Sequence, residues 1–203
     1  MANTDSPFGL RPHNKLGSAP NSMGLTPYKV QIAGVAGSSS AIHQGDMVIP
    51  LTNGLVDVSA ADGGSVAILG VMAGCEYTAL DGTPTFDNKY PGTASLKSGT
   101  EATVFVYDDP HQVYECQADA SLTNLATATA LIHSNAEGTG FGSETANGIS
   151  AGEISVATAG ATTATDNFRI VGIKDVEGID YASAGVVLLV KLNLPFHTAT
   201  TGL

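Results

Sequence analysis

A single stretch decides the fold of this chain: Ala102-Thr-Val-Phe-Val-Tyr-Asp-Asp-Pro-His-Gln-Val-Tyr-Glu-Cys-Gln117. Its first run, residues 102–107, is almost entirely Val, Thr, Phe and Tyr, which favours a strand covered on both sides. Its second run alternates, with Val113, Glu115 and Gln117 on one side and Tyr114 and Cys116 on the other. Asp, Pro and His between the runs are typical of a turn. The stretch therefore predicts a β-hairpin with one flank facing solvent or a partner.

Further strand-like segments lie on both sides of this stretch. Asn53-Gly54 between two apolar runs predicts a hairpin with a type I′ turn, because both residues tolerate a positive φ. Short strands separated by turn residues indicate an all-β protein, with a compact barrel, β-tulip-like or sandwich body. The other predicted strands are residues 28–32, 44–51, 55–58, 66–72, 154–157, 166–173 and 185–193, the last of them central in its sheet.

Three segments carry other patterns. Residues 74–92 read as a long loop with a small hairpin at Asp81-Gly82. Residues 121–136 have apolar side chains near a 3.6-residue spacing behind Ser121, which allows one short helix. Residues 137–152 are rich in glycine and predict a flexible loop. At most one short helix is therefore expected.

Composition limits both size and partners. The chain has 203 residues, of which 43% are hydrophobic and 13% charged, which suits one domain with a neutral surface of small residues. Its formal net charge is −11. Too few cations are present to displace phosphate counterions or to hold an anionic membrane, so neither nucleic acid nor a membrane is an expected partner.

The N-terminal residues differ from the rest of the chain. Residues 2–27 contain four prolines and three glycines, which exclude a helix or a central strand. Residues 1–30 carry a net charge of +2 (three bases and one acid), so residues 31–203 carry −13. We expect residues 1–26 to form an extended arm and residues 27–203 an all-β body. Phe8 and Leu10 would be the apolar anchors of an arm that docks on another chain; the alternative is a disordered terminus.

Targeting signals and cysteines suggest a soluble protein. The first five residues lack the basic and apolar regions of a secretory signal, and the longest aliphatic run, residues 186–190, is far too short for a membrane span. We expect synthesis in a host cytoplasm. Cys75 and Cys116 do not make a disulfide framework, and both are expected to be small buried residues.

One cluster of acidic and histidine residues is a candidate for metal binding or acid–base catalysis. Asp108, Asp109 and His111 could be metal ligands or an acid–base pair, but their spacing matches no zinc or calcium template. The same residues suit a turn, which is the preferred interpretation. No nucleophile elbow, phosphate loop or Cys-x-x-Cys motif occurs. We expect no enzyme activity, no cofactor and no metal.

Three stretches together resemble tailed-bacteriophage capsid cement (head decoration) proteins. They are Ser6-Pro-Phe-Gly-Leu-Arg-Pro12, residues 70–78 with 84–86 and 90–92, and residues 106–110 with 114–117. The region from Gln44 to Val71 is also similar in pattern to small β-tulip decoration proteins. The resemblance covers about residues 6–117, and residues 118–165 fit no pattern.

The resemblance implies a protein without catalysis, assembled as a homotrimer on the capsid exterior of a virion. It also implies that the arm reaches neighbouring major capsid subunits and clamps them together. The implied partner-binding residues are Pro7, Phe8, Gly9, Leu10, Arg11 and Pro12.

Three other functions stay open. The first is a different virion part, such as a tail-tube or head-tail joining protein. The second is a carbohydrate-binding adhesin module, for which the chain, lacking Trp, offers Tyr77, Phe86, Tyr90 and Phe141 as aromatic platforms. The third is metal-dependent hydrolysis at Asp108 and His111.

Overall fold

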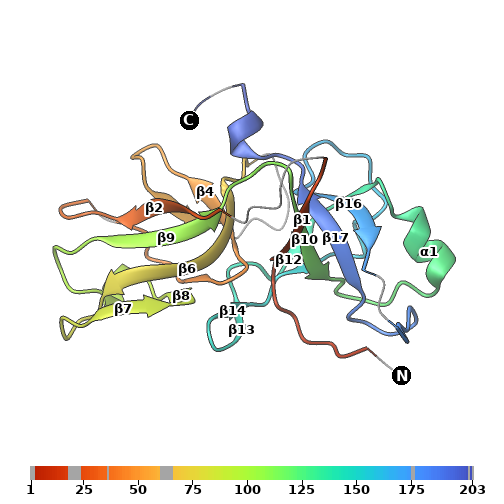
Figure 1. Cartoon of the computed structure of the whole chain (residues 1–203), viewed down its shortest axis with the longest axis horizontal. Coiled ribbons are helices and arrows are strands. Elements are labelled where there is room, and N and C mark those ends of the chain that lie inside the picture. Colours follow the sequence, from red (N-terminus) through yellow and green to blue (C-terminus); the bar gives the residue numbers. More distant parts are fainter. Residues whose placement is uncertain are drawn as a thin grey trace.

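The structure is a computed structural model that describes residues 3–17, 24–35, 37–59, 66–174, 177–200 and 202. It confirms the all-β prediction, with 43% of the described residues in strands and 7% in helices. The described residues form several antiparallel sheets and no closed barrel, so the body is a sandwich type and not a barrel. Two lobes lie side by side along the long axis, each built on one large sheet (Figure 1).

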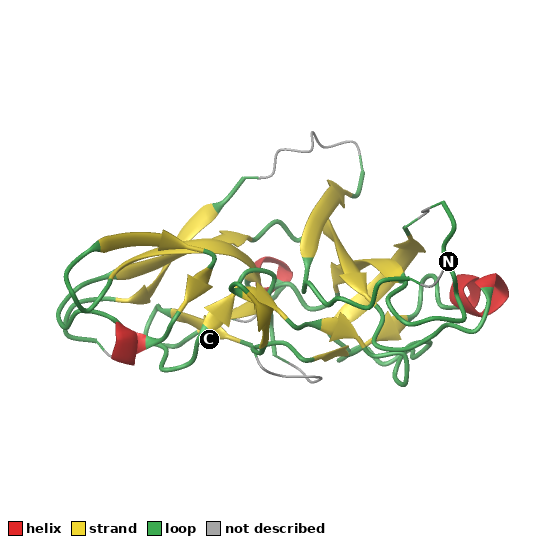
Figure 2. Ribbon diagram, turned by 90° about the horizontal axis from the view of Figure 1, so that it is seen from below, coloured by secondary structure: helices red, strands yellow, loops and turns green. Residues whose placement is uncertain are grey.

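The first lobe contains a five-stranded antiparallel sheet. In spatial order its strands are β1 (Arg11–Lys15), β10 (Gln112–Gln117), β17 (Val187–Leu192), β16 (Phe168–Ile173) and β11 (Asn135–Ala136). β17 is central, as its apolar sequence predicted. Tyr114, Phe168 and Leu188 are fully buried in its core. Figure 2 shows strands along the whole molecule, with the short helix α1 (Leu125–Ala130) at the end of this lobe.

The second lobe contains a six-stranded antiparallel sheet. Five strands follow the order β2 (Thr26–Gln31), β9 (Ala102–Tyr107), β6 (Gly70–Thr78), β4 (Met47–Pro50) and β5 (Val56–Val58), and β7 (Pro84–Asp87) also pairs with β6. A separate core lies under this sheet, where Val104, Met72 and Tyr90 are fully buried. The two lobes therefore have two cores.

The predicted hairpin at residues 102–117 is wrong, although both of its strands are present. β9 pairs with β2 and β6, whereas β10 pairs with β1 and β17 in the other sheet. Both edges of each strand are taken, so neither edge is left for pairing across the turn. Residues 108–111 form the corner between the lobes, where the Asp109 carboxylate accepts a hydrogen bond from the His111 amide at 2.8 Å.

The six-stranded lobe is inserted into the five-stranded sheet. β1 and β10 are antiparallel neighbours, with Arg11 opposite Glu115 and Lys15 opposite Gln112. The Leu16 amide continues this ladder by donating to the His111 carbonyl at 3.0 Å. Every strand of the second lobe's sheet lies between β1 and β10 in the chain. The second lobe thus occupies the place of a hairpin loop.

The pairing of β1 with β10 corrects the prediction of a free N-terminal arm. Residues 11–15 were predicted to belong to an extended arm, yet they form the edge strand β1 of the body. Leu10 is 2% exposed and lies in the core of the five-stranded lobe. Burial of an apolar side chain within its own chain competes with docking on a partner, and here the intramolecular site holds Leu10. Part of the predicted arm, residues 18–23, lies outside the described residues.

Both smaller hairpins are confirmed. β4 and β5 are antiparallel around Asn53-Gly54, and Gly54 has a φ of 79°. Asn53 is not among the described non-glycine residues with positive φ, so the turn is not type I′. β6 and β7 pair around Asp81-Gly82, and Gly82 has a φ of 91°. A glycine relieves the steric cost of the left-handed conformation in each turn.

The short helix is also confirmed, with a different cap. Its N-cap is Asn124, whose side-chain oxygen accepts a hydrogen bond from the Thr127 amide at 2.9 Å. The segment 137–152, predicted to be a flexible loop, instead contains short paired strands. The remaining short elements are β3 (Ile42–His43), β8 (Lys89–Tyr90), β12 (Gly138–Thr139), β13 (Glu144–Ala146), β14 (Ile149–Ser150), β15 (Glu153–Ile154) and the 3-10 turns η1 (Thr93–Ser95) and η2 (Phe196–Thr198). No helix in the described ranges has the length and apolar character needed to cross a membrane.

Candidate functional site

The N-terminal leader, defined here as residues 3–10, is held against the body at its first end by two amide side chains. Asn3 donates to the Asp180 carbonyl at 2.7 Å and accepts from the Asp180 amide at 3.1 Å. Gln117, buried in β10, accepts from the Ser6 amide at 3.1 Å and donates to the Thr4 carbonyl at 3.0 Å. The leader thus follows the surface of its own chain.

At its second end the leader crosses a loop at close range. The Leu10 amide donates to the Gly45 carbonyl at 3.0 Å. Gly9 has a φ of 66°, and a Cβ placed there would lie 2.7 Å from the Cβ of Ser150. Both the backbone conformation and the lack of space therefore require glycine at position 9.

Four of the six predicted partner-binding residues border one hollow. Phe8, Leu10, Arg11 and Pro12 line a hollow of about 290 Å³. The Arg11 guanidinium carbon lies 4.0 Å from the centroid of the Phe8 ring, which is a cation–π arrangement. Tyr107 and Ile149 are among the lining residues from the body. Of the other two predicted residues, Pro7 is partly buried and Gly9 is buried. We call this cavity the leader hollow.

A buried carboxylate lies behind the leader hollow. Asp46 is fully buried and accepts hydrogen bonds from the His43 amide at 2.8 Å, the Gly142 amide at 3.0 Å and the Ser150 hydroxyl at 2.5 Å. The His43 Nδ1 atom is 3.0 Å from the same carboxylate. Within the described residues no hydrogen bond joins Ser150 to His43, so this group lacks the nucleophile–base contact of a hydrolase. The Asp46 carboxylate thus connects its own turn, residues 43–46, to Gly142 and to Ser150.

The Asp108–His111 pair, which was the alternative to the preferred turn interpretation, is not among the contacts of the described residues. The Asp108 carboxylate accepts a hydrogen bond from the Tyr28 hydroxyl at 2.8 Å and lies 3.5 Å from His197 Nε2. Burial, and then the hydrogen bond to Asp108, raise the pKa of Tyr28. His197 could not be expected here from the sequence, because it is 89 residues further along the chain. Among the described residues no group of three or more His, Cys, Asp or Glu is placed to hold a metal.

The rest of the predicted turn cluster is structural. The Asp109 carboxylate pairs with the Lys15 ammonium at 2.6 Å, and that hydrogen bond lowers the pKa of Asp109. Cys75 and Cys116 are buried free thiols, as predicted. Burial raises the pKa of Cys75 to about 12, so its thiolate is scarce at neutral pH.

The four aromatic platform candidates separate into two groups. Phe86 is 76% exposed, and Tyr77 is partly exposed. The prediction is wrong for Tyr90 and Phe141, because these rings are buried in the two cores at 0% and 4% exposure. A buried ring cannot serve as a binding platform.

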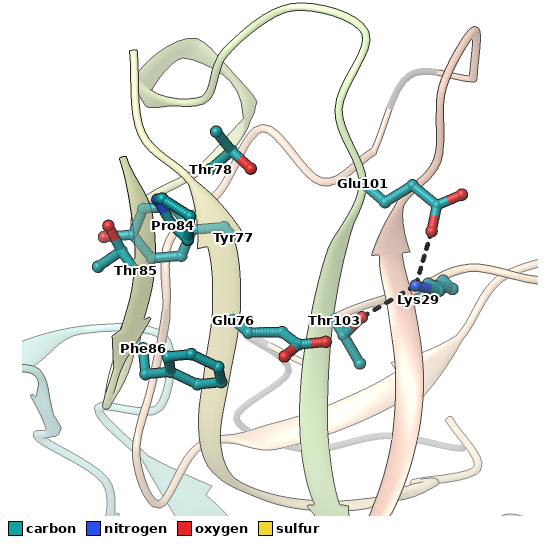
Figure 3. A pocket seen from close by; sticks show the side chains of 9 residues that line it. All are labelled: Lys29, Glu76, Tyr77, Thr78, Pro84, Thr85, Phe86, Glu101 and Thr103. Atoms are coloured by element: carbon teal, nitrogen blue, oxygen red, sulfur yellow. Dashed lines mark hydrogen bonds and ion pairs between the residues drawn. The ribbon is translucent and has the colours of Figure 1, made fainter. Parts of the chain in front are cut away.

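Phe86 lies beside a second hollow, on the outer face of the six-stranded sheet (Figure 3). Strand register places Phe86 opposite Glu76, Glu76 opposite Thr103, and Thr103 opposite Lys29. The four side chains thus form one row across four strands, over a hollow of about 230 Å³. Lys29 donates to Glu101 at 2.8 Å and to the Thr103 hydroxyl at 3.1 Å. We call this cavity the Phe86 hollow.

Fold and geometry define an all-β protein whose surface hollows include the leader hollow and the Phe86 hollow. No protein-family model, curated protein or solved structure matches this chain.

Proposed function

We propose that this chain is a non-enzymatic virion structural protein that decorates the outside of a tailed-phage capsid. Its partners would be the major capsid protein and further copies of itself, assembled as a homotrimer. The observation that carries the proposal is the position of residues 6–12, which contain the first part of the resemblance. Gly9 and Leu10 of this stretch are buried, whereas Phe8, Arg11 and Pro12 keep exposed or partly exposed surface where they line the leader hollow.

The chemistry of the leader hollow suits a protein partner. Phe8 and Pro12 are partly buried, so each offers apolar surface that a docked segment would cover. Arg11 is exposed over the Phe8 ring and can donate several hydrogen bonds to carbonyls or a carboxylate. Aromatic and arginine side chains are enriched at the centres of protein interfaces.

Charge supports a position on the outer surface of the shell. The chain carries a net charge of −11. Four of its eight basic residues are in ion pairs with acids of the same chain, at Lys15, Lys29, Lys89 and Lys174. Packaged DNA would repel such a protein, whereas the exterior of a shell imposes no such cost.

The clamping mechanism changes in one respect. Because Leu10 and β1 belong to the body, the contact with capsid subunits would come from the docked leader and not from a free arm. A folded leader loses less conformational entropy on binding than an extended one. Each weak contact is then multiplied by the repeating lattice.

The test is binding to capsid particles that lack this protein. The double variant Phe8→Ala, Arg11→Ala should lose roughly tenfold or more in affinity, because it removes both side chains of the interface centre. Co-sedimentation with the particles measures the affinity. Leu125→Ala, which removes a 56%-exposed leucine from α1, is the matched control and should bind normally.

Two results would contradict the proposal. If the wild-type protein does not bind the particles, or is found inside the shell, it is not a decoration protein. Native mass separates the closest alternative, because a trimer fits decoration whereas a hexameric or dodecameric ring fits a tail-tube or head-tail joining protein.

A further inference from the structure

We infer that the Phe86 hollow binds a neutral saccharide. This site is distinct from the leader hollow and would give the protein a second binding activity. The inference depends on the side chains of four neighbouring strands and holds whether or not the protein decorates a capsid.

The first argument is the exposure of Phe86. Its ring is 76% exposed on the edge strand β7, next to the hollow. Leaving so much aromatic surface in water is unfavourable, and the ring offers a flat face on which the C–H face of a pyranose can stack. Phe86 points along the row toward Glu76 and not into the core (Figure 3).

The second argument is the free acceptor beside the ring. Within the described residues no hydrogen-bond donor or cation reaches the Glu76 carboxylate, although the side chain is partly buried. Its direct neighbours across the strands are Phe86 and Thr103, neither of which donates to it. A carboxylate can accept hydrogen bonds from two vicinal hydroxyls at once. Sugars present that pair of donors.

The third argument is the set of polar contacts on the side of the hollow opposite Phe86. Lys29 is fixed by Glu101 and by the Thr103 hydroxyl, with N–O distances of 2.8 and 3.1 Å. Tyr77, Thr78 and Thr85 are also among the residues that line the hollow. An aromatic ring with a few fixed polar groups around a shallow cavity is the usual composition of a small-ligand site.

The charge of the hollow selects the class of saccharide. Two carboxylates, Glu76 and Glu101, face one ammonium, Lys29, which is already paired with Glu101. An acidic sugar would meet the unpaired charge of Glu76 and a protein of net charge −11. Neutral hexoses avoid this repulsion.

The experiment uses the purified full chain and a printed array of neutral and sialylated oligosaccharides. Neutral glycans should be retained and sialylated ones should not. NMR titration with lactose, cellobiose and maltotriose as soluble probes then locates the site, and the backbone amides of Glu76, Phe86 and Thr103 should shift. Phe86→Ala and Glu76→Gln should each weaken binding roughly tenfold.

Controls separate stacking and hydrogen bonding from folding. Phe86→Tyr keeps the ring and should retain binding, whereas Phe86→Leu keeps only the apolar volume and should lose it. Leu80→Ala removes an exposed leucine of the same hairpin that does not line the hollow, and this variant should bind normally. All variants should keep the wild-type Tm, because the substituted positions are exposed or partly exposed.

Three outcomes would overturn the inference. One is an array on which no neutral glycan is retained. Another is saccharide binding that Phe86→Ala leaves unchanged. The third is a wild-type oligomer that dissociates in Phe86→Ala with no glycan bound, which would assign this face to a second copy of the chain.

Discussion

The two ends of the leader are held in different ways. Near Leu10 the chain lies over Asp46, a fully buried carboxylate that receives three hydrogen bonds from backbone and hydroxyl donors. Near Asp5 it passes Glu153, which has one buried carboxylate oxygen with no hydrogen-bond partner. Burial and the charges of Asp5 and Asp119 raise the pKa of Glu153 to about 7.

This contrast shows how one short segment can be both fixed and releasable. The Leu10 end depends on packing in the core and on the hydrogen bonds that the buried Asp46 carboxylate receives. The Asp5 end depends on a few hydrogen bonds beside a carboxyl group that titrates near neutral pH. The leader should therefore open from its first residues while Leu10 stays buried.

The largest expected effect is at Asp46. Asp46→Ala leaves the donors of His43, Gly142 and Ser150 without an acceptor, and should lower the free energy of unfolding by about 3–5 kcal/mol. Urea denaturation measures the change. Glu177→Ala, at an exposed position, is the control and should stay within about 0.5 kcal/mol of wild type. Equal stabilities would show that Asp46 does not hold the loops together.

Leu10→Ala should cost slightly less, about 2–4 kcal/mol, because it leaves a cavity in the five-stranded core. Phe8→Ala, two residues earlier and partly exposed, should cost less than about 1 kcal/mol. The pair of denaturation curves separates a leader that is part of the core from an arm that is not. If both variants were as stable as wild type, Leu10 would not be a core residue in solution.

The pH dependence at Glu153 comes next. Its pKa is about 7 in the folded protein against 4.5 as an ordinary glutamate, so the folded state binds more protons in this window. Stability should therefore fall as the pH rises from about 4.5 to 7, by on the order of 1–2 kcal/mol. Glu153→Gln should flatten this part of the profile of Tm against pH. A wild-type slope that persists in the variant would assign the titration to another group.

The last change is at Gln117. Gln117→Ala removes the hydrogen bonds to Ser6 and Thr4 and should cost about 1–2 kcal/mol. Amide exchange of Ser6 should speed up while exchange of Leu10 stays slow. Simultaneous acceleration at both residues would mean that the leader detaches as one unit, which contradicts the difference between its two ends.

Much of the local structure could be predicted from the sequence, but the pairing of its strands could not. The alternation in residues 112–117 and the glycines at 54 and 82 are local signals, and each gave the right element. Which strand lies beside β9 depends on which edges other strands have taken. Proximity in sequence favoured β10, and tertiary pairing overrode it.

The candidate sites show the same limit. Phe86 is exposed, whereas Tyr90 and Phe141 are buried. The sequence around these three aromatic residues does not distinguish them, because burial depends on residues that are distant in the chain. Leu10 lies in a stretch where apolar residues alternate with prolines and glycines. Such a stretch is compatible both with a free arm and with a segment buried against an edge strand, so its sequence could not decide between them. Asp46 carried no signal of its burial, because His43-Gln-Gly-Asp46 is a polar stretch ahead of the apolar run and its donors Gly142 and Ser150 lie about a hundred residues away.

The insertion of one lobe into the other has a consequence for synthesis. A ribosome releases β1 almost a hundred residues before β10, its only neighbour in the sheet of described strands. The six-stranded lobe can finish folding in that interval, while the nascent first strand waits for its partner. β1 would then be among the last strands to reach the native state, and a newly made chain would briefly present this unpaired strand to its surroundings.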